Sequence, residues 1–465
     1  MLSQKWISLT AASLGLFLGS LDITVNVALP EMASSFEADQ KTVQWIIIFY
    51  VGTTTSLQLT LGNAADTYGL KRFYISGLII YTVAVTLIAF APNISSLFIF
   101  RMVQALGNGL ILASTPALVT VIFPSKDRGK AMGFMTCIAT LGLIAGALMG
   151  GVLVDLYGWR SIFMMRVPIG IAILIFALHS TQQIPLQSKK SRFDFAGAFI
   201  LTAGLASLIL FLSLGGRMGW ASLPNILLCF TSVGLLIWLV LRQKILSKHT
   251  IKPNLLKDRI SITIMAITLI TYLATFVNWF IMPFYVSEIL GSSASTLGTL
   301  LMLMTLLGAL SAPIGGWMSD KISPSIVISC GTLILLTGIF SFISLTQHSD
   351  VKELAVRLAV TGIGMGLFQA ATYSAMMRRL PFGSLGTGSA MLALCRSLGT
   401  VTSVAILGSL WAKRLSFNML VINNDIEAFM TSFVNIYTLA GVLMTVAVLV
   451  SFSIWPRFTK KEFTL

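Results

Sequence analysis

The side chains best placed to do chemistry are five charged residues inside long apolar stretches: Asp22, Arg101, Arg166, Arg357 and Arg396. A charged side chain inside a bilayer costs at least about 2.5 kcal/mol, so each of them is a functional candidate. Asp22 is the only acid well inside such a stretch. A carboxylate beside a guanidinium group favours its ionised form, whereas apolar surroundings favour the protonated form. A side chain that alternates between these environments takes up and releases protons.

Other reactive groups do not form a recognisable catalytic pattern. His179, His249 and His348 are scattered, and the chain has no H-E-x-x-H, P-loop or nucleophile-elbow motif. Each of the four cysteines lies in an apolar run without metal-ligand spacing, which is typical of buried thiols. The sequence therefore predicts neither an enzyme nor an ATP-driven pump, and no cofactor or metal. A channel is also disfavoured, because no stretch resembles a selectivity filter or a ring of acids.

The composition predicts that the chain folds in a bilayer. Hydrophobic residues make up 56% of the sequence and charged residues only 10%, against about a quarter charged in a soluble domain. A spanning helix needs roughly 20 apolar residues. We expect an all-α polytopic membrane protein with fourteen spans, at about 6–30, 42–62, 73–92, 97–122, 131–154, 161–180, 195–214, 223–241, 259–284, 294–314, 325–345, 354–376, 387–411 and 431–455.

The basic residues are unevenly distributed among the predicted loops. Of the 31 Lys and Arg residues, 21 fall in the two termini and the even-numbered loops, and six fall in the odd-numbered loops. Cytoplasmic loops of membrane proteins carry the basic excess, so we expect both termini in the cytoplasm. The net charge of +15 then reflects these loops, and no nucleic-acid partner is expected.

One loop pattern occurs twice, half a chain apart. The stretch LGNAADTYGLKRFY places Gly62 four residues before Asp66, and GGWMSDKISPS repeats this spacing with Gly316 and Asp320. Both copies fall on the predicted cytoplasmic side, which indicates a parallel repeat of two helical bundles. We expect a six-helix bundle, two intervening helices with a cytoplasmic linker, and a second six-helix bundle, at 1–194, 195–258 and 259–465.

The first copy is predicted to form a gating loop, with Asp320 marking the equivalent place in the second. A turn of seven or eight residues needs backbone freedom, which Gly62 and Gly69 can supply. Asp66 can accept hydrogen bonds from a helix N-terminus or an arginine, and Lys71 and Arg72 can hold the loop at an anionic lipid surface. The alternative is an ordinary tight turn that carries positive-inside charges.

This loop is similar to the signature loop of the major facilitator superfamily, G-x-x-x-D-x-x-G-x-K-R. Six further stretches resemble its drug:proton antiporter group with fourteen spans: LDITVNVALP at 21–30, RMVQALGNG at 101–109, GALMGG at 146–151, GWRSIF at 158–163, FDFAG at 193–197 and GTGSAMLALCRSLGT at 386–400. The resemblance covers essentially the whole chain. It departs at Ala147, where the family usually has the proline of a motif associated with antiport.

The resemblance implies a secondary active multidrug exporter that works by alternating access. The expected cargo is an amphipathic drug, such as a dye or a quinolone-like compound, exchanged for protons. An alternative is export of another cargo, such as a lipid precursor, an amino acid or a peptide, with Na⁺ as the coupling ion. The resemblance also implies a monomer in the lipid bilayer of a bacterial cytoplasmic membrane.

Proton coupling is assigned to Asp22, with Arg101, Arg166 and Glu31 as the other members of the predicted site. At about 1.5 Å per residue, Asp22, Arg101 and Arg166 all fall in the outer half of the first bundle, within reach of one another. The alternative is a buried Asp–Arg pair that only holds helices together. Arg166 could instead face an anionic or zwitterionic substrate. Arg357 is expected to snorkel to the surface, and the role of Arg396 is left open.

Substrate binding is assigned to an apolar and aromatic chamber near the membrane midplane. Aromatic surfaces accommodate varied apolar drugs by repacking. For each single residue, the alternative is lipid contact or core packing. The predicted binding residues are Asn26, Trp45, Tyr50, Gln58, Asn278, Trp279, Phe280, Phe368, Gln369 and Tyr373.

Overall fold

The structure is a computed structural model of the 465-residue chain. It describes residues 2–123, 128–180, 193–246, 258–379, 385–422 and 424–455. Over these ranges the chain is helical and contains no strand. Fourteen segments of the described residues are long and apolar enough to cross a membrane, and each coincides with one predicted run. The prediction of an all-α protein with fourteen spans is therefore confirmed.

The described residues form two compact units. The first comprises residues 1–211, 222–245 and 293–299, and the second comprises 212–221, 246–292 and 300–465. The predicted three-part division at 194 and 258 stays a prediction.

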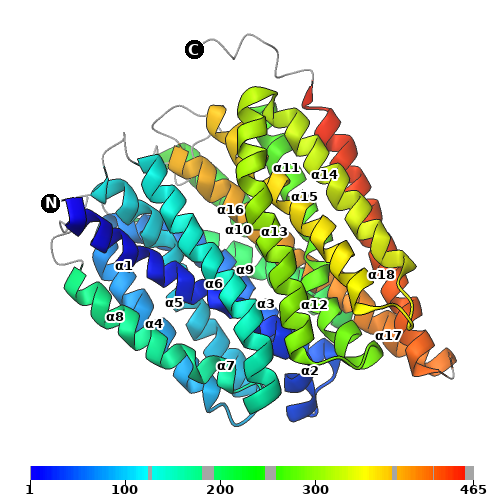
Figure 1. The fold of residues 1–465 in the computed structure, drawn as a ribbon. Helices are drawn as coiled ribbons and strands as arrows, with labels where there is room; N and C mark the ends of the chain where they lie inside the picture. The colour runs from blue at the N-terminus through cyan, green and yellow to red at the C-terminus, as the bar shows by residue number, and fades with distance from the viewer. Residues whose placement is uncertain are drawn as a thin grey trace. The chain divides into compact units, whose positions relative to one another are not determined.

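The first unit is built around helices that run alongside one another (Figure 1). Its helices, of which α9 and α10 extend a few residues into the second unit, are α1 (Leu2–Ser20), α2 (Thr24–Ser35), α3 (Gln40–Tyr68), α4 (Leu70–Ala89), α5 (Ile94–Ile122), α6 (Arg128–Tyr157), α7 (Ser161–Met164), α8 (Arg166–Ser180), α9 (Phe195–Met218) and α10 (Leu223–Leu246). A short 3-10 turn, η1 (Leu21–Ile23), separates α1 from α2 inside one membrane span.

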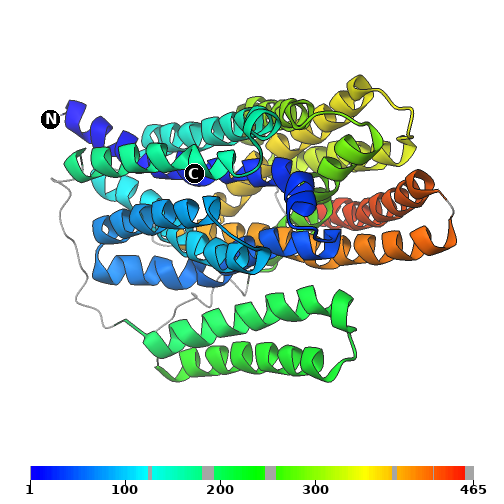
Figure 2. The same cartoon turned by 90° about the horizontal axis from the view of Figure 1, so that it is seen from below.

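The helices α9 and α10 lie side by side as a pair (Figure 2). Arg242 on α10 donates hydrogen bonds to both carboxylate oxygens of Asp194, just before α9, at 2.5 and 2.8 Å. On its other side, α9 contacts α3, where the hydroxyl oxygens of Thr60 and Thr202 are 2.8 Å apart.

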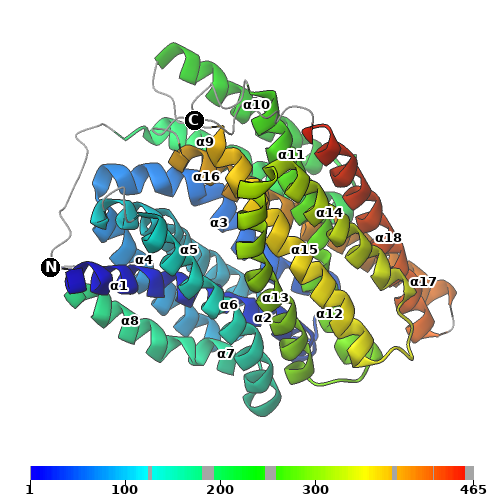
Figure 3. The ribbon, with the colours of Figure 1, turned by 45° about the horizontal axis from the view of Figure 1, so that its top comes forward.

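In the second unit, α14 lies along both α15 and α18 (Figure 3). Its helices are α11 (Arg259–Thr275), α12 (Val277–Phe284), α13 (Ala294–Lys321, whose first turns belong to the first unit), α14 (Pro324–Ser341), α15 (Val351–Arg378), α16 (Leu385–Thr402), α17 (Ser409–Val421) and α18 (Asp425–Phe452). Among the residues that the structure describes, three irregular turns interrupt or extend these helices, at η2 (Tyr285–Ile289), η3 (Phe342–Ser344) and η5 (Ser403–Gly408).

A row of glycines on α6 brings the broken first span close to its neighbour. A Cβ atom at Gly142 would lie 2.6 Å from the carbonyl oxygen of Phe17, and one at Gly146 would lie 3.1 Å from the Cα of Leu21. Glycines at this four-residue spacing let helix backbones approach closely. The α6 backbone therefore holds the irregular turn at Leu21 in place, and with it the neighbouring Asp22.

The first gating loop differs from the predicted turn of seven or eight residues. The helix α3 continues through Gly62 to Tyr68, and α4 begins at Leu70, so the turn consists of Gly69 alone. The φ angle of Gly69 is 108°, a conformation that side chains with a Cβ rarely adopt. The prediction was wrong because the polar residues after the apolar run prolong the helix instead of ending it. Gly62 therefore supplies no turn.

Candidate functional site

Asp22 lies at the break in the first span. The 3-10 turn at Leu21–Ile23 interrupts the α-helical hydrogen-bond pattern between α1 and α2. Such a turn inside a helix is typical of functional hinges. The Asp22 side chain is 9% exposed, so its charge depends on protein partners rather than on water.

Arg101 and Gln104 on α5 donate three hydrogen bonds to Asp22. Arg101 donates from Nη1 to Oδ1 of Asp22 at 2.8 Å and from Nη2 to Oδ2 at 3.0 Å. This two-pronged geometry is the strongest form of an arginine–carboxylate pair. Gln104 Nε2 donates to the same Oδ1 at 2.9 Å, and its own oxygen accepts from Arg101 at 2.6 Å. The guanidinium group also lies over the ring of Tyr50, 4.1 Å from its centroid.

Arg166, at the first position of α8, approaches Asp22 from the other side. Its Nη1 donates to Oδ1 of Asp22 at 2.7 Å, and its Nη2 donates to the carbonyl oxygen of Leu21 at 2.9 Å and to the hydroxyl of Thr24. The carbonyl of Leu21 belongs to the 3-10 turn, so Arg166 hydrogen-bonds to the backbone of the helix break as well as to Asp22. Arg166 is fully buried.

We call Asp22, Arg101, Gln104 and Arg166 the Asp22 cluster. It holds one carboxylate and two guanidinium groups, so its formal charge is +1. Taking a charged group out of water costs several kcal/mol per ion. This cost is offset only where the ion-pair geometry is favourable and further hydrogen bonds satisfy the charged atoms. The four hydrogen bonds to Asp22 meet that condition. The cluster can hold the carboxylate ionised while the arginines are in contact, and it can change protonation only if they withdraw.

Glu31 does not join the cluster. It lies nine residues beyond Asp22 on α2, where its carboxylate is close to Gly158 and the backbone of Trp159. The structure therefore separates one of the four predicted proton-coupling residues from the other three. Arg357 lies outside the cluster too, near the start of α15, where it donates to Glu353 at 3.3 Å.

The predicted gating residues are described only in part. The side chains of Asp66 and Asp320 lie outside the described residues. Lys71 is half-buried and Arg72 is exposed, both in the first turn of α4.

The predicted substrate residues of the first unit differ in their surroundings. Tyr50 lies under Arg101, and its hydroxyl accepts a hydrogen bond from Asn108 at 2.8 Å. Asn26 and Trp45 are buried, and Trp45 packs against the ring of Phe49. Gln58 is half-buried on α3. Of these four, Tyr50 alone contacts the Asp22 cluster through a contact that the structure describes.

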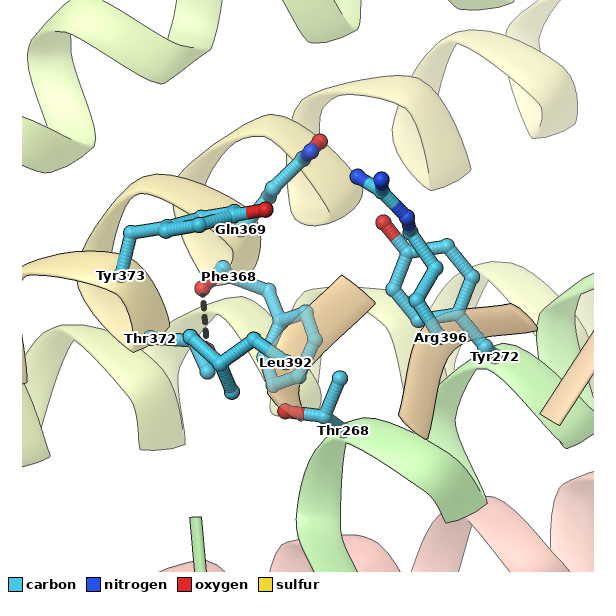
Figure 4. A pocket seen from close by; sticks show the side chains of 8 residues that line it. All are labelled: Thr268, Tyr272, Phe368, Gln369, Thr372, Tyr373, Leu392 and Arg396. Carbon is cyan, nitrogen blue, oxygen red and sulfur yellow. Dashed lines mark hydrogen bonds between the residues drawn. The ribbon is translucent and has the colours of Figure 1, made fainter. Parts of the chain in front are cut away.

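The second unit contains a small hollow. Three predicted residues of α15, Phe368, Gln369 and Tyr373, line it together with Arg396 of α16 (Figure 4). The remaining lining residues are Thr268, Tyr272, Thr372 and Leu392.

The other predicted residues of the second unit lie outside the lining of this hollow. Asn278 is buried and accepts a hydrogen bond from the Tyr437 hydroxyl at 2.8 Å. Phe280 packs against Trp411, and Trp279 is half-buried. The contacts of Asn278 and Phe280 are those of core packing, which was the alternative for each residue.

Sequence reasoning missed Gln104 and Tyr272 as site residues. A signal for Gln104 was present, because a residue three positions after Arg101 lies on the same helix face. Tyr272 had no comparable signal, since its position in the hollow depends on α15 and α16, which are distant in sequence. Among the described residues, no group of three His, Cys, Asp or Glu side chains could hold a metal ion.

Comparison with known proteins identifies the family. The Major Facilitator Superfamily profile matches residues 11–252 and 264–464. The riboflavin transporter RibZ of Clostridioides difficile is 27% identical over 90% of each chain. The multidrug resistance protein Stp of Mycobacterium tuberculosis is 28% identical, over 88% of this chain and 76% of its own. The multidrug transporter protein MdtP of Bacillus subtilis is also 28% identical, over 89% of this chain and 76% of its own.

Solved structures agree with this fold. A bacterial homologue of the human lysosomal transporter Spinster, in an inward-facing and unoccupied conformation, superimposes with a TM-score of 0.73 over 98% of both chains at 15% identity. The peptide transporter POT, in complex with sulfate, superimposes with a TM-score of 0.70, also at 15% identity, over 97% of this chain and 94% of its own. Since the family profile covers almost the entire sequence, the chain belongs to the Major Facilitator Superfamily.

Proposed function

We propose that this multi-pass membrane transporter exchanges protons for a small amphipathic molecule, with Asp22 as the residue that carries the proton. The observation that carries the proposal is the buried Asp22 cluster, in which one carboxylate contacts two arginines at a break in the first span. Ionisable groups inside membrane spans are rare and are typical of proton relays and ion pathways.

The coupling step follows from the two environments open to Asp22. With Arg101 and Arg166 in contact, the carboxylate is ionised. When the helices that carry the arginines move away, apolar surroundings favour the protonated form. Proton binding and the change of access state are then linked, because each arrangement of the helices prefers one charge state. We place Glu31 on the route by which protons reach Asp22 from the outer surface.

The proposed cargo is supported by the relatives and by the lining residues. Two relatives are named as multidrug proteins and one as a riboflavin transporter, and riboflavin is an aromatic, amphipathic molecule. The hollow in the second unit offers aromatic rings beside polar groups. A flavin is the second candidate cargo, because RibZ matches 90% of both chains. Lipid precursors, amino acids and peptides are the further alternatives, with Na⁺ as the alternative ion.

Three other features belong to the proposal. Both termini lie in the cytoplasm, as the distribution of basic residues predicts, and the protein works as a monomer in a bacterial cytoplasmic membrane. The repeated cytoplasmic loops, with Gly69, Asp66 and Asp320, act as a latch on one access state. The chain divides functionally into two six-helix bundles and two intervening helices.

Transport by purified protein in liposomes tests this function. The probes are a fluorescent cationic dye, a zwitterionic fluoroquinolone and riboflavin, each with an imposed pH gradient or an imposed Na⁺ gradient. The pH gradient should drive uphill movement of at least one probe, and the Na⁺ gradient should drive none. Uphill movement with Na⁺ alone, or no gradient-driven movement of any probe, would contradict the proposal.

A further inference from the structure

Arg396 lies in a setting that the proton-coupling proposal does not explain. Together with Tyr272 of α11 and Gln369 and Tyr373 of α15, it lines the small hollow in the second unit. Its guanidinium group faces the phenol hydroxyls of Tyr272 and Tyr373, and the end of the Gln369 side chain lies nearby (Figure 4). Polar groups from three helices therefore converge on one space.

The hollow lies deep within the membrane spans. Arg396 is eleven residues from the start of α16, Tyr272 is thirteen residues from the start of α11, and Gln369 is nine residues from the end of α15. At about 1.5 Å per residue, these positions lie roughly 14 to 20 Å from the helix ends. The hydrocarbon core of a bilayer is about 30 Å thick, so the hollow is close to its middle.

None of the ion pairs between described side chains includes Arg396. The described acids of the second unit lie at or near helix ends: Asp258, Glu288, Asp350, Glu353, Asp425 and Glu427. Phenol and amide groups can accept hydrogen bonds from a guanidinium group but cannot neutralise its charge. Arg396 thus contrasts with the two arginines of the first unit, which share Asp22.

We propose that Arg396 binds an anionic group of the cargo, a carboxylate on an aromatic ring system, inside this hollow. A planar guanidinium group matches a carboxylate with two parallel hydrogen bonds. The rings of Phe368 and Tyr373 line the same hollow beside Arg396. The hollow is far smaller than a complete site for a drug-sized molecule, which measures about 300–1,000 Å³, so only the charged end of the cargo lies in it. This inference rests on the proposed function, whose cargo class it narrows.

Binding measurements on the purified full-length chain in lipid nanodiscs test this assignment. The probes are a fluoroquinolone with a free carboxylate and its methyl ester, which keeps the ring system and the amine. Replacing Arg396 by Gln should weaken binding of the acid about ten- to hundredfold, as expected for lost hydrogen bonds to a charged group. Binding of the ester should change less than about twofold. Arg396→Lys should restore part of the affinity for the acid, since it keeps the charge without the planar fork.

Arg357→Gln provides the matched control, because it removes an arginine from the same unit outside the lining of the hollow. This control should leave the affinity for the acid unchanged. Equal losses for acid and ester in Arg396→Gln, an unchanged affinity for the acid, or no binding of the acid by the intact protein would each overturn the inference. Binding needs no ion gradient, so a protein that discriminates acid from ester but shows no proton-driven transport would contradict the coupling proposal alone.

Discussion

The charges of the Asp22 cluster lead to a quantitative prediction about the free energy of unfolding. The intact cluster carries a formal charge of +1. Asp22→Asn raises it to +2 and leaves two buried arginines without a carboxylate, whereas Arg166→Met lowers it to zero and keeps the pair with Arg101. Breaking a buried pair by removing one partner costs about 3–5 kcal/mol. We therefore expect Asp22→Asn to lower the free energy of unfolding by about that amount.

The double variant restores the formal charge of +1 and relieves the repulsion between the two arginines. Arg166→Met alone should cost less than Asp22→Asn, because Asp22 keeps its two-pronged pair with Arg101. It removes one hydrogen bond to Asp22 and the hydrogen bonds to Leu21 and Thr24, of which the last two are worth about 1 kcal/mol each. The two substitutions should then be non-additive, with a coupling of about 1–3 kcal/mol.

Unfolding followed by tryptophan fluorescence in detergent micelles measures these four proteins. Glu353→Gln is the matched control, since it removes a carboxylate from a pair in which Glu353 is 54% exposed, and such pairs contribute up to about 1 kcal/mol. If the loss in the double variant equals the sum of the single losses, the reasoning from a shared buried charge is refuted.

Two further predictions concern the ends of helices. Gly69→Ala places a side chain at a φ of 108° and should lower the free energy of unfolding by about 1–2 kcal/mol. Gly62 lies inside α3, where an added Cβ meets no atom within 4 Å, so Gly62→Ala should raise the free energy of unfolding by up to about 1 kcal/mol. Equal melting temperatures for the two variants would contradict this. At the start of α11, partial burial alone would raise the pKa of Asp258, but hydrogen bonds from Arg379 and Ser261 lower it below its usual value. The stability from this pair is therefore present above about pH 4 and is lost as the pH falls through the folded-state pKa, so the intact protein should lose melting temperature more steeply below about pH 4 than Asp258→Asn, and parallel curves would oppose the assignment.

The fourteen spans could be predicted from the sequence because each depends on a local property, a run of apolar residues of sufficient length. The contact of Asp22 with Arg101 and Arg166 could be anticipated for a related reason. Charged side chains are so costly inside a bilayer that the few present are expected to gather.

The helix break at Asp22 could not be predicted in the same way. The 3-10 turn at Leu21–Ile23 itself contains no glycine or proline; Gly19 precedes it inside α1, and the proline of this span, Pro30, lies within α2. The break depends on partners distant in the sequence, namely the Arg166 side chain and the glycines of α6. Similarly, the length of the turn at Gly69 depended on how far α3 continues beyond its apolar run.

The hollow around Arg396 illustrates a second limit. Its lining comes from α11, α15 and α16, and no spacing in the sequence joins Tyr272 to Arg396. The sequence identified Arg396 as a charged residue inside a span but offered no partner for it. The partners became visible only when the three helices were placed in one unit.

The central claim, that Asp22 couples cargo movement to protons, is tested most directly by comparing two transport modes of Asp22→Asn in liposomes. One mode is exchange of labelled for unlabelled cargo at equal concentrations and equal pH, and the other is uphill movement driven by a pH gradient. The account predicts that Asp22→Asn retains exchange and loses gradient-driven movement, because cargo binding and the change of access remain while the proton carrier is gone. Uphill movement that persists in Asp22→Asn would contradict the account.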